Sequence, residues 1–194
     1  MEKLFNEWYK QQCINENAKE SSFICDGSLS DDYLEQHEIL FVCRESHDTA
    51  LGFKKYFWFK NVVDGLATKG KKYYNCVKSI IDYINNNIEP ENENIDIKKC
   101  GYINVNKKGG SSSCNFQILD EYAKKYQEYI IEEIKILKPK RIVLLGKLYK
   151  APNAESIFVN YGRENNIPVY LLPDTEITRQ KAAGLLIGRP RKPA

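Results

Sequence analysis

A carboxylate closely follows an uninterrupted apolar run of four residues. Residues 39–42 (ILFV) have no polar interruption, which is typical of a strand buried on both faces of a parallel sheet. Because ligands bind just past the carboxyl ends of such strands, we expect Glu45 to face a cleft as a general base or an electrostatic stabiliser. An ion pair with Arg44, or a helix cap near Thr49, would explain this glutamate equally well.

An asparagine interrupts a second strand-like segment, residues 101–105 (GYINV). Asparagine is unfavourable inside a strand, so Asn104 marks either the end of the strand or a turn ahead of the NKKGG sequence. At a strand end its carboxamide offers one acceptor and two donors, which match the edge of a pyrimidine base. Base reading and turn formation both remain open from the residues alone.

Lysines and glycines follow this segment at Lys107, Lys108, Gly109 and Gly110. Glycine lets successive backbone N–H groups converge and lysine adds charge, so these residues could form a small anion-binding nest. The spacing is not that of a P-loop. A flexible polar loop is the alternative interpretation.

Two further kinds of side chain between residues 47 and 59 could take part in base chemistry. The aromatic-rich run there is typical of a hydrophobic core, although Phe53 or Phe57 could stack on a base. His47 could act as an acid or a base, but a single histidine is more often structural or exposed.

The elements that must position these residues alternate along the chain. Apolar residues at helical spacing predict helices over residues 2–19, 73–88, 116–137 and 153–165. Apolar runs predict strands over residues 39–43, 101–105, 141–145 and 169–172. Residues 23–33 are expected to form a loop with a turn at Asp26-Gly27.

Strands that recur after long crossovers predict an α/β fold. We expect a three-layer α/β/α sandwich with a central, mostly parallel sheet of four to five strands. Three polar loops, residues 44–48, 106–114 and 173–178, would then lie at one edge of the sheet and line the active cleft.

Size and composition are those of one globular domain. The chain has 194 residues, a length that suits a single domain, which we expect over residues 1–188. The net charge is +3, and residues 189–194 are expected to form a basic tail. The sequence has neither an apolar run of about 18 residues nor a secretory signal pattern, so we expect a cytoplasmic protein without membrane contact. Six scattered cysteines without a CxxC pair predict free thiols rather than disulfides or a metal site.

The order of these segments resembles the uracil-DNA glycosylase superfamily, and more closely a bacterial and phage-associated branch of it. ILFVCRES matches the family's water-activating loop, with Glu45 in place of its aspartate, and GYINVNKKGG places Asn104 at the base-reading position. VYLLPDTEIT falls where the third loop, which enters the minor groove, belongs; it contains Asp174 and Thr175, and Arg179 follows it. The resemblance covers about residues 23–180.

Two departures from the family bear on activity. The first loop lacks the family's glycine, glutamine and proline, and Arg44 and Ser46 stand in the last two places. The histidine of the third loop is absent. In the family that histidine supports the negative charge that develops on the departing base, so its role would fall to Lys107, Arg179 or His47.

The resemblance implies a DNA base glycosylase that acts as a monomer on single- or double-stranded DNA, without a metal or cofactor. A pyrimidine would be flipped out of the stack. Asn104 would hydrogen-bond its edge, Phe53 or Phe57 would stack on its face, and Glu45, with His47, would promote hydrolysis of the glycosidic bond. The residues implied in gripping phosphate are Arg44, Lys107, Lys108, Gly109, Gly110, Asp174, Thr175 and Arg179.

Other functions remain open from the sequence. Because an asparagine carboxamide can rotate, the base could be uracil or a modified cytosine. The alternatives to a glycosylase are a catalytically weakened protein that still binds nucleic acid or a nucleotide, a hydrolase of free nucleotides or nucleosides, and an unrelated α/β domain that contacts other proteins.

Overall fold

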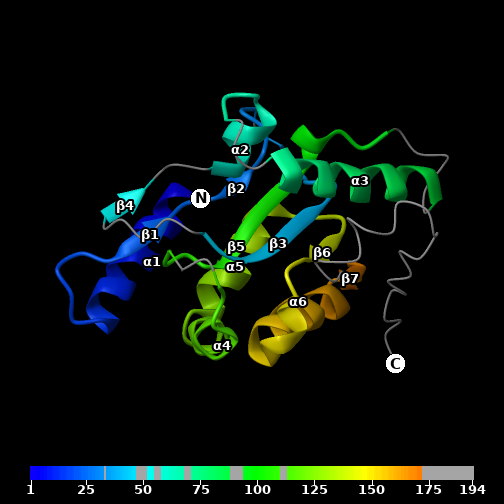
Figure 1. Ribbon diagram of the computed structural model, residues 1–194. Coiled ribbons are helices and arrows are strands. Elements are labelled where there is room, and N and C mark those ends of the chain that lie inside the picture. Colours follow the sequence, from blue (N-terminus) through cyan, green and yellow to red (C-terminus); the bar gives the residue numbers. More distant parts are fainter. Residues whose placement is uncertain are drawn as a thin grey trace.

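The computed structural model describes residues 1–32, 34–46, 52–54, 58–67, 71–87, 94–109 and 113–171. Within them the chain has a mixed α/β fold built on a five-stranded sheet in the order β2-β5-β3-β6-β7 (Figure 1). These strands are β2 (Gly27–Ser28), β5 (Gly101–Asn106), β3 (Leu40–Glu45), β6 (Ile142–Leu144) and β7 (Val169–Leu171). Neighbouring strands are parallel, except that β2 is antiparallel to β5. The predicted α/β class and mostly parallel sheet are confirmed.

The central strand β3 owes its unbroken apolar sequence to its position. Residues 40–42 are fully buried because elements pack on both faces of the strand. In the parallel register Leu40 lies opposite Gly101 of β5, and Glu45 lies opposite Asn106. β3 and β5 therefore end together, and their last residues are neighbours at the carboxyl edge of the sheet.

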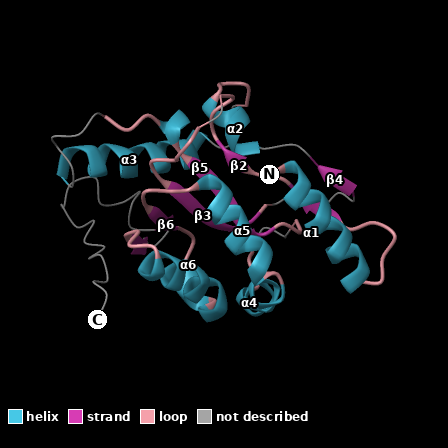
Figure 2. Ribbon diagram, turned by 180° about the vertical axis from the view of Figure 1, so that it is seen from behind, coloured by secondary structure: helices cyan, strands magenta, loops and turns pink. Residues whose placement is uncertain are grey.

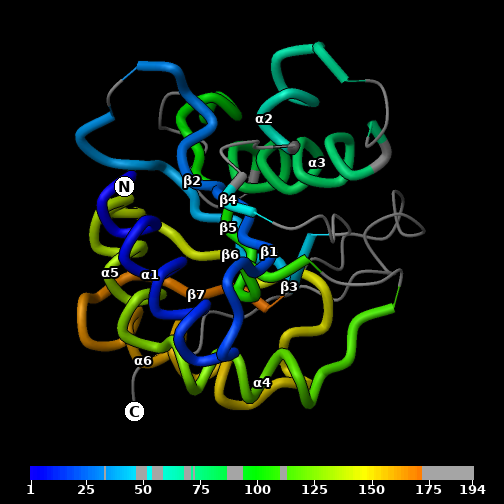
Figure 3. The backbone as a smooth tube through the Cα atoms, turned by 90° about the vertical axis from the view of Figure 1, so that its left-hand side faces the viewer, coloured from blue at the N-terminus to red at the C-terminus, as the bar shows by residue number. Residues whose placement is uncertain are grey.

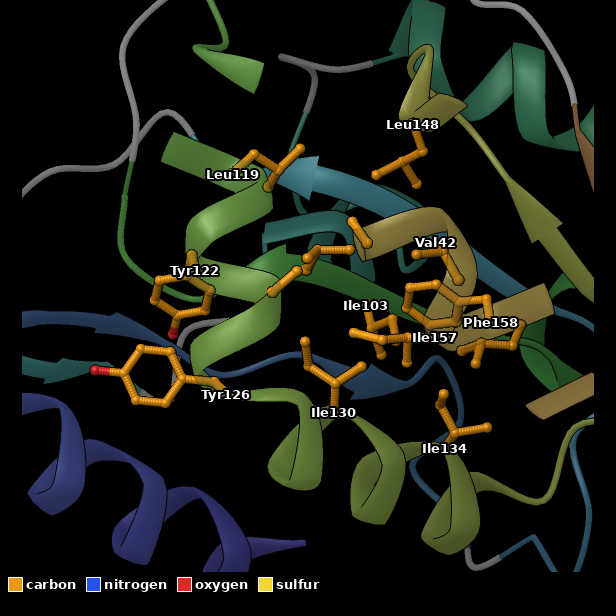
Figure 4. Packing of buried hydrophobic residues seen from close by; sticks show 14 of the residues in the cluster. Val42, Ile103, Leu119, Tyr122, Tyr126, Ile130, Ile134, Leu148, Ile157 and Phe158 are labelled. Carbon is orange, nitrogen blue, oxygen red and sulfur yellow. The ribbon is translucent and has the colours of Figure 1, made fainter. Parts of the chain in front are cut away.

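One face of the sheet is covered by α1 (Glu2–Asn15), α4 (Phe116–Lys125), α5 (Gln127–Leu137) and α6 (Pro152–Glu164), as Figure 2 shows. These helices share an apolar core with the sheet, to which Val42, Ile103, Ile130 and Phe158 contribute (Figure 4). Trp8 brings α1 into the same core and is fully buried. The amphipathic opening helix is confirmed, although it ends at Asn15 rather than at residue 19.

The opposite face is covered by α2 (Trp58–Val63) and α3 (Lys71–Asn87), and Figure 3 shows them on the other side of the sheet from α4 and α6. Ile80 and Ile84 of α3 pack with Phe41 and Cys43 of β3 in a second apolar cluster. The 3.6-residue spacing of the apolar side chains predicts this helix correctly. Two short 3₁₀ helices, η1 (Ile97–Lys99) and η2 (Leu148–Lys150), precede β5 and α6.

Two predicted elements differ from the structure. The expected loop over residues 23–33 contains β2 and most of β1 (Ser22–Ile24), which pairs in parallel with β4 (Gly52–Lys54). Strands of two and three residues are too short to show an alternating pattern, and their partners lie far along the chain.

The predicted helix over residues 116–137 is two helices that meet at Tyr126. This residue has φ −113° and ψ 22°, outside the helical range, and it ends α4 and begins α5. Tyr126 is itself buried, and its ring centroid lies 4.5 Å from that of Tyr122. Apolar side chains of both helices, among them Tyr122 and Ile130, belong to one core.

Two expectations concern the whole chain. All six cysteines are thiols outside any disulfide, as predicted, and Cys25, Cys43 and Cys100 are buried. Among the residues that the structure describes, no helix combines the length and the apolar character needed to span a membrane.

Candidate functional site

Two polar side chains meet where β3 and β5 end. Asn106 Nδ2 donates to Glu45 Oε2 at 3.3 Å. Asn106 Oδ1 accepts the Lys108 backbone N–H at 2.9 Å, a local turn that holds the carboxamide with its NH₂ group toward Glu45. Glu45 is only half-buried. A carboxylate is therefore presented at the edge where its sequence position predicts it.

A thiol also approaches this carboxylate. Cys114 forms a side-chain hydrogen bond with Glu45. Burial and the negative charge of Glu45 raise the pKa of Cys114 to about 11, while Arg44 acts in the opposite direction. The thiol stays protonated at neutral pH and donates to Glu45, so Cys114 is a supporting group and not a nucleophile.

Asn104 lies two residues before the end of β5, with Cys43 of β3 opposite it. Alternate residues of a strand face the same side, so Asn104 and Asn106 share a face of β5. The register puts Glu45 on that same side, the one that α2 and α3 cover. The structure thus brings Glu45 and Asn104 together on adjacent strands, although they are 59 positions apart in the sequence.

The hydrogen bonds of Asn104 are asymmetric. Asp26 Oδ2 accepts both the Asn104 backbone N–H, at 2.6 Å, and its side-chain Nδ2, at 3.2 Å. The carboxamide oxygen Oδ1 is buried and has no hydrogen-bond partner among the residues that the structure describes. A buried carbonyl left in this state costs about 1–3 kcal/mol, which makes it a place where a ligand donor would be stabilised.

Asp26 belongs to a buried cluster of three ionisable side chains. Lys107 Nζ forms an ion pair with Asp26 and lies 2.9 Å from Glu133 Oε1 and 2.8 Å from Glu133 Oε2. All three side chains are almost fully buried, and Lys107 also lies over the rings of Phe5 and Trp8. The cluster ties the segment before β2 to the end of β5 and to α5.

One cation cannot neutralise two carboxylates in this apolar setting. Burial raises the pKa of Glu133 well above its usual range; Lys107 lowers it, and the nearby charge of Asp26 raises it further. Burial lowers the pKa of Lys107, but Asp26 and Glu133 outweigh this, so the pKa is raised and Lys107 stays charged. Both directions favour a charged Lys107 beside a protonated Glu133.

This cluster corrects the interpretation of Lys107. The sequence predicts a lysine that grips phosphate or supports a departing base. The ammonium group is instead fully enclosed between two carboxylates, because β5 ends against α1 and α5. Lys108, in contrast, is half-exposed and its Nζ lies 3.1 Å from Glu16 Oε1 at the surface. The residues of the predicted anion-binding nest are therefore separated: Lys107 is buried, whereas Lys108 is exposed and Gly109 follows it, partly exposed.

A second group of basic side chains lies at the same edge of the sheet. Arg44 and Lys150 both lie over the ring of Phe116, at 5.9 and 5.7 Å from its centroid. Gly146 makes room for Arg44: its φ is +75°, and a Cβ there would come within 2.9 Å of Arg44 Nε. Two cations, one of β3 and one of η2, thus gather around Phe116 at the start of α4.

The predicted stacking residue Phe53 lies elsewhere. Its ring stacks on Phe23, with centroids 5.6 Å apart and planes 12° apart, and it also contacts Tyr9 of α1. Aromatic rings on the Asn104 side of the sheet include those of Tyr102 and Tyr73, in T-shaped contact at 6.0 Å, and that of Phe59, which contacts both. Burial raises the pKa of both phenols, which therefore stay protonated.

Several predicted residues lie outside those that the structure describes. They are His47, Phe57, Gly110, Asp174, Thr175 and Arg179, together with the basic tail. Sequence reasoning did not assign a role to Asp26, Asn106 or Tyr102. If GYINVN is taken as a strand up to Asn106, its alternation of residues places Tyr102, Asn104 and Asn106 on one face. That pattern would have identified Tyr102 and Asn106, but not Asp26.

Metal binding is a further chemistry that histidine, cysteine and carboxylate side chains can supply. Among the described residues, no group of three or more histidine, cysteine, aspartate or glutamate side chains is arranged to hold a metal ion. Comparison with protein-family models, with curated proteins and with solved structures finds no match to this chain.

Proposed function

We propose that this protein is a DNA base glycosylase that flips out a pyrimidine, either uracil or a modified cytosine, and hydrolyses its N-glycosidic bond. The proposal includes a three-layer α/β/α sandwich, of which the sheet and its covering helices form the framework, and a monomer that acts on DNA in the cytoplasm. The observation that carries it is that Glu45 and Asn104 lie on one side of two adjacent parallel strands, and that Oδ1 of Asn104 has no hydrogen-bond partner among the described residues.

Glu45 has the position that the hydrolytic step requires. It stands at the carboxyl edge of the sheet, half-exposed, and Asn106 and Cys114 hold its carboxylate. Departure of a base leaves an oxocarbenium-like sugar, which a fixed negative charge stabilises while the carboxylate orients the attacking water. Two donors that orient a carboxylate suit that role.

Asn104 supplies the group that would recognise the extruded base. Its Oδ1 has no partner among the described residues and is shielded from solvent, so a base reaches it only by displacing the side chains packed over this face. Tyr102 and Tyr73 are among the described aromatic groups there that could contact the base in place of Phe53. Flipping would therefore combine unstacking of the base with local opening of the site.

The surface around the site supports contact with a phosphate backbone. Arg44, Lys150 and Lys108 are cations of the carboxyl edge and of the segment after β5. Cations so placed would grip phosphates on either side of a flipped nucleotide, with an affinity that falls as salt concentration rises. Lys107 is not among them because it is buried in the ion cluster.

The test is formation of abasic sites. The protein is incubated with single- and double-stranded DNA containing uracil, 5-hydroxymethylcytosine or its glucosylated form, and alkali then cleaves at abasic sites. We expect Glu45→Gln to lower the single-turnover rate by about 10²–10⁴-fold and to leave DNA affinity unchanged. Glu38→Gln is the matched control, since Glu38 lies just before β3, at its opposite end, paired with Lys140.

Two results would contradict the proposal. Salt-dependent DNA binding without any abasic product would indicate a binding protein instead. Cleavage of free nucleotides or nucleosides, with no action on DNA, would indicate a small-molecule hydrolase that uses the same glutamate and asparagine.

A further inference from the structure

We infer that Asp26 is a positioning residue that locks the carboxamide of Asn104, so that the site accepts a hydrogen bond from the base and requires an N–H group on it. This inference rests on the proposed function. It concerns a residue that lies outside the strands of the site, in the segment between β1 and β2.

The first step is the direction of the Asn104 amide. Asp26 Oδ2 contacts both nitrogens of Asn104, the backbone N at 2.6 Å and Nδ2 at 3.2 Å. A carboxylate only accepts hydrogen bonds, so a flipped amide would set Oδ1 against Oδ2 with no proton between them. The NH₂ group must therefore face Asp26, and Oδ1 must face away from it.

The second step is the rigidity of Asp26 itself. Its other oxygen, Oδ1, is ion-paired to Lys107, and the side chain is almost fully buried. The backbone contact to Asn104 also replaces a strand-to-strand hydrogen bond at the edge of β5, beyond the end of β2. Rotation of Asp26 would break all of these contacts at once, so the carboxylate is a fixed reference for the amide.

The consequence is a restriction on the base. One hydrogen of Nδ2 is engaged by Asp26, and the unpartnered group is an acceptor, Asn104 Oδ1. The imide N3–H of uracil satisfies it, and so does the 4-amino group of cytosine or a 5-substituted cytosine. A pyrimidine without such a donor leaves Oδ1 buried and unpaired. Sites built around a buried hydrogen bond reject analogues that lack it by large factors.

The experiment compares rates for bases with and without the donor. Single-turnover rates of abasic-site formation are measured for two pairs of bases. Uracil is compared with N3-methyluracil, and 5-hydroxymethylcytosine is compared with 5-hydroxymethylpyrimidin-2-one, which lacks the 4-amino group. The wild-type ratio is expected to be about 100-fold or more in favour of the base with the donor. Asp26→Asn, whose neutral side chain no longer dictates the orientation of the Asn104 amide, is expected to reduce that ratio by about tenfold or more.

The structure offers a matched control for this variant. Asp120 likewise accepts from the backbone N and the Nδ2 of one asparagine, Asn153, both at 2.6 Å but on its two different oxygens, and it does so on the exposed side of α4 and α6. Asp120→Asn should leave the ratio unchanged. Comparing ratios between variants also cancels the intrinsic reactivity of each base.

The Asp26→Asn variant has a reason to fold, because Glu133 can ionise and neutralise Lys107 in its place. Thermal unfolding checks that this variant folds. Asp26→Glu is a second variant: it keeps the negative charge but displaces it, and we expect the same loss of discrimination between the bases. Equal discrimination in wild type and both Asp26 variants would overturn this inference alone. Absence of abasic product from every DNA would overturn the proposed function and this inference with it.

Discussion

Replacing Glu133 by glutamine should change how the stability of this protein depends on pH. Glu133 is buried beside Lys107 and Asp26, and its pKa in the folded protein is raised, first by burial and then by the charge of Asp26. The folded protein therefore keeps a proton on Glu133 at pH values where the unfolded chain releases it. Raising the pH then favours unfolding, so this group stabilises the fold fully below its ordinary pKa of 4.5 and progressively less above it.

The magnitude follows from the linkage between proton binding and stability. Between the ordinary pKa and the raised one, a single group lowers the free energy of unfolding by about 1.4 kcal/mol per pH unit. Glutamine cannot titrate, but its carbonyl can still accept from Lys107, so Glu133→Gln should cost only about 1 kcal/mol near pH 5. The stability of Glu133→Gln relative to wild type should then rise by up to about 3 kcal/mol between pH 5 and pH 7.

The measurement is urea unfolding of both proteins at half-unit steps over that range. Groups that titrate identically in the two proteins, such as His37, cancel in the difference. Glu132→Gln is the control, because Glu132 is the preceding residue of α5 but is half-exposed and pairs with Lys135 at the surface. Its difference from wild type should be small and nearly independent of pH.

A constant difference between wild type and Glu133→Gln would refute the reasoning. It would mean that Glu133 is ionised in the folded protein and that the cluster carries a net negative charge. Lys107→Met gives an independent check, since it leaves Asp26 buried without a cation. We expect it to destabilise the protein by about 3–5 kcal/mol, far more than Glu133→Gln.

Other changes test single contacts. Gly162→Ala should destabilise the protein by about 1–3 kcal/mol in urea unfolding, because a Cβ there would lie 2.7 Å from the Ile167 carbonyl oxygen and collide with Val169; a neutral result would contradict this packing. Asn115→Ala should cost about 1 kcal/mol, since Asn115 caps α4 through two backbone N–H groups, and thermal unfolding measures it. Cys114, with its pKa of about 11, should be alkylated by iodoacetamide more slowly at pH 8 than in the unfolded chain, as peptide mapping would show, and Glu45→Gln should speed the reaction.

Local patterns predict most of the framework. The apolar run before Glu45 is enough to identify β3, because a strand that is buried on both faces has a continuous apolar sequence and not an alternating one. The helical spacing of Ile80 and Ile84 identifies α3 for a similarly local reason. Glu45 and Asn104 could be chosen as candidates because their positions depend only on where these strands end. In each case neighbours in the sequence determine which side chains are apolar and on which face.

The environment of the charged residues could not be predicted in this way. Lys107 stands in a polar, glycine-rich stretch that indicates a surface loop, yet its ammonium is enclosed by Asp26 and Glu133, which are 81 and 26 positions away. Asp26 similarly has the sequence context of a turn, but its carboxylate binds Asn104, 78 positions away. Burial of a charge depends on which elements pack around it, and no local pattern records that.

Periodicity along the chain is enough to place the alternating strands and helices, the buried central strand, and a carboxylate and a carboxamide at strand ends. The contact of Asn106 with Glu45, the direction that Asp26 gives to the Asn104 amide and the burial of Lys107 follow from the fold alone. Apolar spacing encodes where apolar surface must go, whereas hydrogen-bond partners and the protonation of buried groups depend on contacts between distant segments.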